Sequence, residues 1–251
     1  MRLIAFALTA IPMAAYAHGP APVDGWTLAV AAALALSAGI YLKAWFRGAA
    51  LGRRDAAAFA GGWVAVALAV LSPLDRLAAG SFGLHMVQHE LLMVIAPPLL
   101  ILGRPFTALG AVLSRRGIAL AAWPLRIPPP AAFLLHAIAL WGWHLPALFE
   151  GALASPALHA LQHASFFGTA LLFWWAVFRR ARIGAAVLYI LATIIHTGAL
   201  AALLTFAPAS MYASASLDEQ QLGGLVMWVP AGYAMLLAGL LAFERFVGED
   251  A

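Results

Sequence analysis

Long apolar stretches of about 20 residues follow one another along the chain, separated by short polar segments. A stretch of that length crosses a hydrocarbon core of about 30 Å as an α-helix. We expect Pro97-Pro98 to kink one such helix, because proline donates no backbone hydrogen bond. The pattern predicts an all-α integral membrane bundle of about seven spans, at Trp26–Trp45, Ala56–Leu74, Leu84–Leu102, Ala131–Phe149, Ala157–Phe178, Ile183–Phe206 and Leu222–Phe243.

Two segments outside these spans have patterns of their own. Residues 1–17 are typical of a signal peptide, with Arg2 before a short apolar run and Ala15-Tyr16-Ala17 as a cleavage site. An uncleaved anchor is the alternative, and both place the following residues outside the cytoplasm. Residues 18–251 then form one membrane domain. Between the third and fourth spans, Arg104 to Pro130 predicts a short helix in the cytoplasmic interface.

Charged residues are scarce and unevenly distributed. The chain is 65% hydrophobic and 10% charged, which excludes a water-soluble domain. Its basic residues lie in short clusters between spans, where they set topology and form no nucleic-acid surface. The positive-inside rule predicts N-out, C-in orientation in the cell inner membrane. Inner loops then hold twelve of the 14 basic residues: Lys43, Arg47, Arg53, Arg54, Arg104, Arg115, Arg116, Arg126, Arg179, Arg180, Arg182 and Arg245.

Five histidines lie near the outer ends of three predicted helices. His85 and His89 begin the third span, His159 and His163 begin the fifth, and His144 lies late in the fourth. Spacing of i, i+4 places two imidazoles on one helix face about 6 Å apart, so each pair can hold a metal ion. The chain has no cysteine, which excludes thiolate sites. We predict a metal site facing the periplasm; hydrogen bonding between helices is the alternative.

Other polar and sulfur-bearing residues are secondary candidates. Met93 continues the first histidine stripe, and a thioether beside imidazoles would favour Cu(I). For His136 and His196, deeper in the membrane, we expect a neighbour's hydroxyl or carbonyl as partner. Asp218-Glu219 could attract a cation or cap the last helix. Gly223-Gly224 indicates close approach of another backbone.

Three motifs between about residues 80 and 240 resemble the multi-spanning CtaG-type cytochrome c oxidase assembly factors. They are His85-Met86-Val87-Gln88-His89 with Ala96-Pro97-Pro98, His159 to His163 with Phe173-Trp174-Trp175, and Gln220-Gln221-Leu222-Gly223-Gly224. The chain departs from the family pattern at two positions. Ala176 stands where that family has proline, and Glu219 stands where it has aspartate.

The resemblance implies a role in maturing a haem–copper oxidase, by supplying copper to it. We therefore predict an assembly factor, not an enzyme, that binds copper through His85, His89, His144, His159 and His163 and passes it to an oxidase subunit. A periplasmic copper chaperone is a candidate donor, membrane lipid surrounds the protein, and no nucleic acid is involved. Two alternatives stay open: a haem-binding membrane oxidoreductase with bis-histidine ligation, and a metal-free membrane chaperone for oxidase subunits.

Overall fold

A computed structural model describes residues 25–113 and 127–249, and every regular element in these ranges is helical. The predicted signal peptide lies outside the described residues. So does most of the predicted interfacial segment, whose first part is the helix α6. The helices are α1 (Gly25–Phe46), α2 (Arg53–Val70), α3 (Pro73–Ala78), α4 (Phe82–Glu90), a π-helical turn (Leu91–Ile95), α5 (Ala96–Leu102), α6 (Pro105–Leu113), α7 (Pro129–Trp143), α8 (Pro146–Ala154), α9 (Pro156–Arg179), α10 (Ile183–Thr205) and α11 (Leu217–Glu249).

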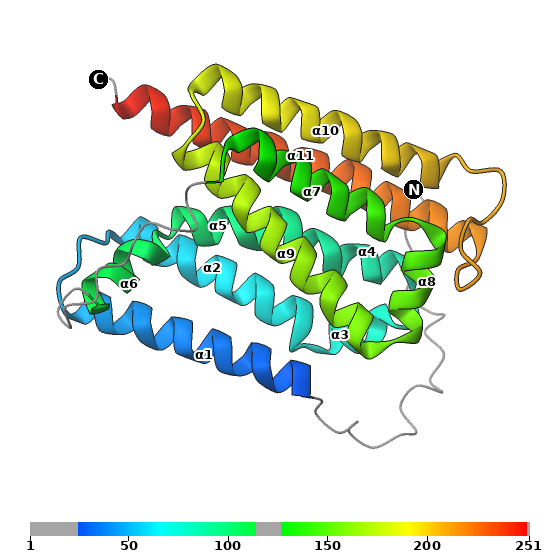
Figure 1. Ribbon diagram of the computed structural model, residues 1–251, viewed down its shortest axis with the longest axis horizontal. Helices are drawn as coiled ribbons and strands as arrows, with labels where there is room; N and C mark the ends of the chain where they lie inside the picture. Colours follow the sequence, from blue (N-terminus) through cyan, green and yellow to red (C-terminus); the bar gives the residue numbers. More distant parts are fainter. Residues whose placement is uncertain (1–24, 114–126, 250–251) are drawn as a thin grey trace, which may run out of the picture.

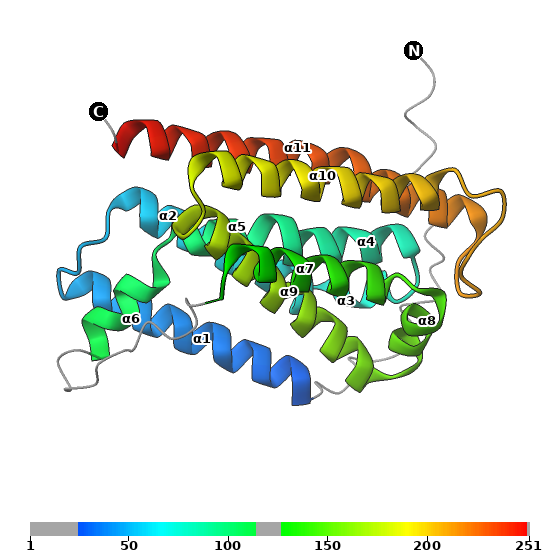
Figure 2. The ribbon, with the colours of Figure 1, turned by 45° about the horizontal axis from the view of Figure 1, so that its top comes forward.

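The long helices run roughly along one axis of a bundle (Figure 1). Helices α10 and α11 lie side by side on one flank, and α1 lies on the opposite flank, as the turned view in Figure 2 also shows. Large apolar side chains cover the outside, among them Leu36 at 66% exposed and Leu188 at 65% exposed. Such a surface suits a hydrocarbon solvent and not water.

The membrane character predicted from the sequence is confirmed, and the count of seven spans is supported only in part. Five helices of the described chain are long and apolar enough to cross a membrane, or six if the bent pair α7–α8 is one span. They match the predicted first, third, fifth, sixth and seventh spans, with the bent pair as the fourth. The second, Ala56–Leu74, is the 18-residue α2, which carries Arg53, Arg54 and Asp55 in its first turn. Its crossing of the membrane stays a prediction.

The prediction that the fourth span is one helix over Ala131–Phe149 is wrong. Helix α7 ends at Trp143, α8 begins at Pro146, and the two axes meet at 75°. Pro146 has no amide hydrogen to continue α7, and its ring forces Leu145 into an extended conformation with ψ of 130°. The bend leaves His144 as the C-cap of α7.

A π-helical turn, Leu91–Ile95, precedes the Pro97-Pro98 pair, and the kink expected at the prolines stays a prediction. The amide of Ala96 donates to the carbonyl of Leu91, five residues back. Neither proline can donate to the carbonyl of Met93, four or five residues before it. The indole Nε1 of Trp174 on α9 donates to that carbonyl instead, at 3.1 Å. The distortion therefore joins the α4 segment to α9.

Helix α11 packs against α4 and α10 through two adjacent glycines, and the close backbone approach that the sequence predicts is found at Gly224. A Cβ atom on Gly223 would lie 2.3 Å from the ring of Phe82 on α4. A Cβ atom on Gly224 would lie 2.8 Å from the carbonyl oxygen of Ala201 on α10. No larger residue fits either position unless a neighbour moves.

The two ends of the bundle differ in charge. We call one end the basic end, because the helix ends there carry Lys43, Arg47, Arg53, Arg104 and Arg182. At the other, the acidic end, α3 carries Asp75 and Arg76, α8 carries Glu150, and the first turn of α11 carries Asp218 and Glu219. This separation agrees with the sorting of charges in the sequence. That the basic end faces the cytoplasm stays a prediction.

Candidate metal centre

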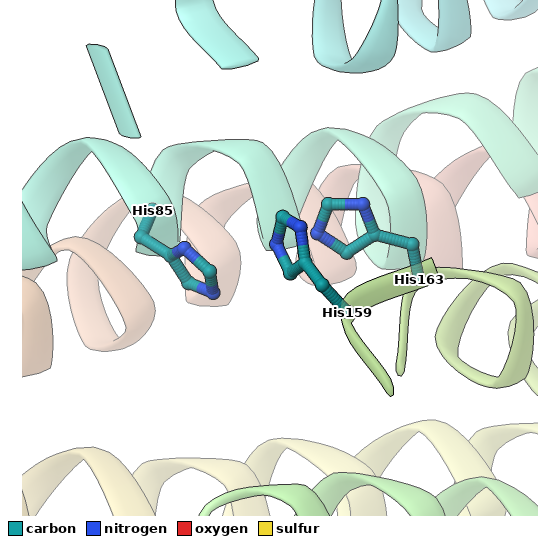
Figure 3. A group of neighbouring side chains, drawn as sticks. All are labelled: His85, His159 and His163. Atoms are coloured by element: carbon teal, nitrogen blue, oxygen red, sulfur yellow. The ribbon is translucent and has the colours of Figure 1, made fainter. Parts of the chain in front are cut away.

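The structure brings all five predicted histidines together near the acidic end. His85 and His89 on α4 face His159 and His163 on α9, and Figure 3 shows His85 opposite the α9 pair. Ring centroids lie 4.3 Å apart for His85 and His89, and 4.1 Å apart for His159 and His163. Between the helices, His85 lies 5.3 Å from His159, and His89 lies 5.6 Å from His163. His144 joins from α7, 6.1 Å from His89.

Three of these residues form the tightest group. His85, His159 and His163 each offer one ring nitrogen, and these three atoms lie within 4.8 Å of one another. Three nitrogens at about 2.0 Å from one ion would lie roughly 3.5 Å apart. Side-chain movements on the order of 1 Å therefore bring the group to ligating geometry. His89 and His144 are outside this group.

Six ring nitrogens of the cluster are buried and have no hydrogen-bond partner among the described residues. His85, His89 and His163 are 1%, 0% and 3% exposed. The Nε2 atoms of His85, His144, His159 and His163 have no partner among the described residues, and neither nitrogen of His89 has one. Each unpaired buried polar group costs about 1–3 kcal/mol, so such a concentration of them needs a shared ligand as explanation. A metal ion fits this set of donors.

His144 has its tautomer fixed by the backbone. Its Nδ1 lies 2.7 Å from the carbonyl oxygen of Leu140, so Nδ1 carries the proton and donates. The Nε2 atom is then the free acceptor. The carbonyl of His144 itself accepts a hydrogen bond from the hydroxyl of Tyr212 at 2.8 Å. Orientation of a ring through its second nitrogen is the usual support for a metal-binding histidine.

Two buried glutamines accompany the histidines, and the sequence interpretation missed them. Both pairs follow the pattern His-x-x-Gln-His, with Gln88 before His89 and Gln162 before His163. Gln88 donates to the carbonyl of Ala69 and to Asp75, both at 2.7 Å, and its Oε1 has no partner among the described residues. The side chain of Gln162 is 0% exposed and interacts with His85. The repeated glutamine was the signal in the sequence that could have identified them.

The secondary candidates lie outside the group of three histidines that could hold an ion. His136 contacts the hydroxyl of Thr169 at 3.2 Å, as predicted, whereas His196 accepts from the indole of Trp141 at 3.3 Å. Met93 packs in the main apolar core. Glu219 caps α4 and not its own helix. Its Oε2 accepts from the Ser81 hydroxyl at 2.8 Å and from the Gly83 amide at 3.3 Å.

Among the described residues, an apolar groove and a smaller cavity reach the cluster. An apolar groove of about 610 Å³ lies between α1, α2, α5 and α9, and it reaches His163. A smaller cavity of about 180 Å³ lies at the acidic end between α4, α8 and the α10–α11 loop, and it reaches His85. The walls of the small cavity include Ser81, Ser214 and Glu219.

Comparison with known proteins identifies the family. The family model "Cytochrome c oxidase caa3 assembly factor (Caa3_CtaG)" matches residues 26–248, nearly the whole of the described chain. Neither a search of curated proteins nor a search of solved structures gives a match. The matched range contains the histidine cluster, the Pro97-Pro98 turn and the glycine pair of α11. The chain therefore belongs to the family of cytochrome c oxidase caa3 assembly factors.

Proposed function

We propose that this assembly factor binds a copper ion through His85, His159 and His163, with His89 and His144 as additional donors, and passes the ion to an oxidase subunit. The observation that carries the proposal is the set of buried, unpartnered imidazole nitrogens that meet from α4, α7 and α9. Binding and release require no turnover chemistry, so we propose a carrier and not an enzyme.

The charge of the donors favours Cu(I) over a divalent ion. All five ligands are neutral imidazoles, so the bound ion keeps its full charge among buried groups. The idealised cost of burying a single charge is of order 20 kcal/mol, and it rises with the square of the charge. The carboxylate of Asp75 acts electrostatically on His159, but it is hydrogen-bonded to Gln88. A monovalent ion is therefore the cargo that this site tolerates best.

The separation of charge between the two ends supports a proposal for the side of the membrane on which copper is received and passed on. With the basic end in the cytoplasm, the cluster lies on the periplasmic side of the inner membrane. A periplasmic copper chaperone would then be the donor, and a subunit of cytochrome c oxidase the recipient.

Copper binding by purified variants tests the proposal. Purified protein in detergent is titrated with ascorbate-reduced copper against a colorimetric Cu(I) chelator, and we expect one tightly held ion per chain. The double variants His85→Ala/His89→Ala and His159→Ala/His163→Ala lose two donors each and should yield their copper to the chelator. The matched control is His136→Ala, whose ring contacts Thr169 outside the cluster. Wild-type copper retention in both double variants would refute the site.

The apolar groove is the one observation that favours haem instead. It reaches His163 and its walls include Trp63 and Trp175, which suits a flat apolar cofactor. A visible spectrum of the purified protein separates the two functions. A Soret band that disappears in His163→Ala would support haem binding, whereas bound copper without that band supports the proposal.

A further inference from the structure

We propose that the 180 Å³ cavity at the acidic end is the route by which copper enters and leaves the cluster, and that Glu219 is a cation-binding carboxylate on this route. The inference rests on the proposed function, since it assigns the path to the same site. The cavity is bounded by the α3–α4 junction, by Phe149 and Leu153 of α8, and by residues 214–216 of the α10–α11 loop.

The cavity reaches the cluster directly. His85 forms part of its wall, although the side chain is only 1% exposed and its Nε2 has no partner among the described residues. An ion in the cavity therefore meets His85 first, and His159 and His163 next. The hydroxyls of Ser81, Ser214 and Ser216 stand on the same walls, and they can replace water ligands as an ion advances.

Glu219 holds a carboxylate at a fixed place in this cavity. Both of its hydrogen bonds, from Ser81 and from the amide of Gly83, go to Oε2. The Oε1 atom is left to accept a cation. Because Gly83 stands two residues before His85, the same bonds also fix the distance between the carboxylate and the first histidine.

The charge around the entrance selects for cations. Glu150 on α8 accepts from the amide and the hydroxyl of Ser214, both at 3.0 Å, which places a second carboxylate beside the cavity wall. Asp75 acts electrostatically on His159 from α3. None of Asp75, Glu150 and Glu219 forms an ion pair with a described residue. Unpaired carboxylates around a narrow opening raise the local cation concentration and the rate of entry.

The other opening cannot serve a hydrated ion. The groove that reaches His163 is walled by side chains such as Val30, Leu92 and Phe167, which offer no ligands to replace water. Removing the water ligands of an ion without replacing them by other ligands has a large free-energy cost, which makes this groove a poor route. The polar cavity is thus the opening whose chemistry matches the cargo.

The rate of copper uptake tests the route separately from the site. Purified protein is mixed rapidly with Cu(I) held by a weak colorimetric chelator, and the loss of the chelator's colour is followed. Glu219→Gln keeps an acceptor for Ser81 and Gly83 but removes the charge. We expect uptake about tenfold slower with the final stoichiometry unchanged. Asp218→Asn, one residue away, exposed and outside the cavity, is the matched control and should load at the wild-type rate.

A steric variant gives an independent arm. Ala79 is an exposed residue of the cavity wall, and Ala79→Trp should narrow the opening and slow uptake while Glu219 is intact. Wild-type uptake rates in both variants would overturn the route. A reduced copper stoichiometry in Glu219→Gln would also overturn it, by showing that the residue supports the site and not the path. If the wild-type protein itself binds no copper, the proposed function fails first.

Discussion

Replacing Gly224 by alanine tests whether direct backbone contact holds α11 against α10. The added Cβ atom would lie 2.4 Å from the hydroxyl of Thr205, 2.8 Å from the carbonyl oxygen of Ala201 and 2.9 Å from the amide nitrogen of Thr205. The hydroxyl is not free to leave, because it donates to the Ala201 carbonyl at 2.8 Å. The other two atoms belong to the backbone of α10. Relief therefore requires that one helix move away from the other.

Two opposing terms set the size of the effect. Overpacking of this kind costs about 1–3 kcal/mol. Replacing a helical glycine by alanine returns about 1 kcal/mol through helix propensity. We expect Gly224→Ala to lose up to about 2 kcal/mol of unfolding free energy. Gly232 lies in the same helix, and a Cβ atom added there would meet nothing within 4 Å, so Gly232→Ala keeps the gain without the clash.

The assay is thermal unfolding of the purified variants in one detergent, followed by tryptophan fluorescence. Gly224→Ala should unfold below the wild-type temperature, and Gly232→Ala at or above it. Because the propensity gain is common to both, the gap between the two variants measures the contact alone. Equal shifts of the same sign in the two variants would show that α10 and α11 are not held together by this approach.

Three other changes have expected outcomes in the same assays. Trp174→Phe leaves the buried Met93 carbonyl without its donor, and it should cost about 1–3 kcal/mol in thermal unfolding. Gln162→Leu removes a buried side-chain amide that interacts with His85, so it should weaken copper affinity about tenfold. Tyr212→Phe removes the donor to the carbonyl of His144 and should cost about 1 kcal/mol; an unchanged unfolding temperature would refute that role.

Much of the fold could be predicted because the membrane imposes simple rules on sequence. The prediction Ala157–Phe178 falls within one residue of α9 at each end, since the apolar run is bounded by Pro156 and by Arg179. Ala176 leaves α9 unbroken, and its carbonyl accepts from the amide of Arg180. The bend at Pro146 was equally visible in the sequence. It was missed because length and hydrophobicity alone were used to define that span.

The composition of the histidine cluster was predictable, but its arrangement was not. Equal depth followed from the loop charges, and a shared face followed from the i, i+4 spacing. Neither rule says which helices are neighbours, so the opposition of His85 to His159 emerges only from the fold. The same holds for Glu219, whose carboxylate accepts from Ser81, 138 residues earlier in the chain. Contacts between distant segments depend on packing that no local pattern encodes.

Residues of the three sequence motifs all contribute to holding α4 in place. The Pro97-Pro98 motif frees the Met93 carbonyl, and Trp174 of the second motif donates to it, which fixes the π-helical turn that follows α4 to α9. Gly223 of the third motif lets α11 pack directly on Phe82, at the start of α4. Beside that motif, Glu219 caps the same helix. The helix that carries His85 and His89 is therefore held at both ends by residues that are not ligands. We therefore expect the proposed copper site to change little when an ion leaves, and a small reorganisation cost favours repeated loading and release.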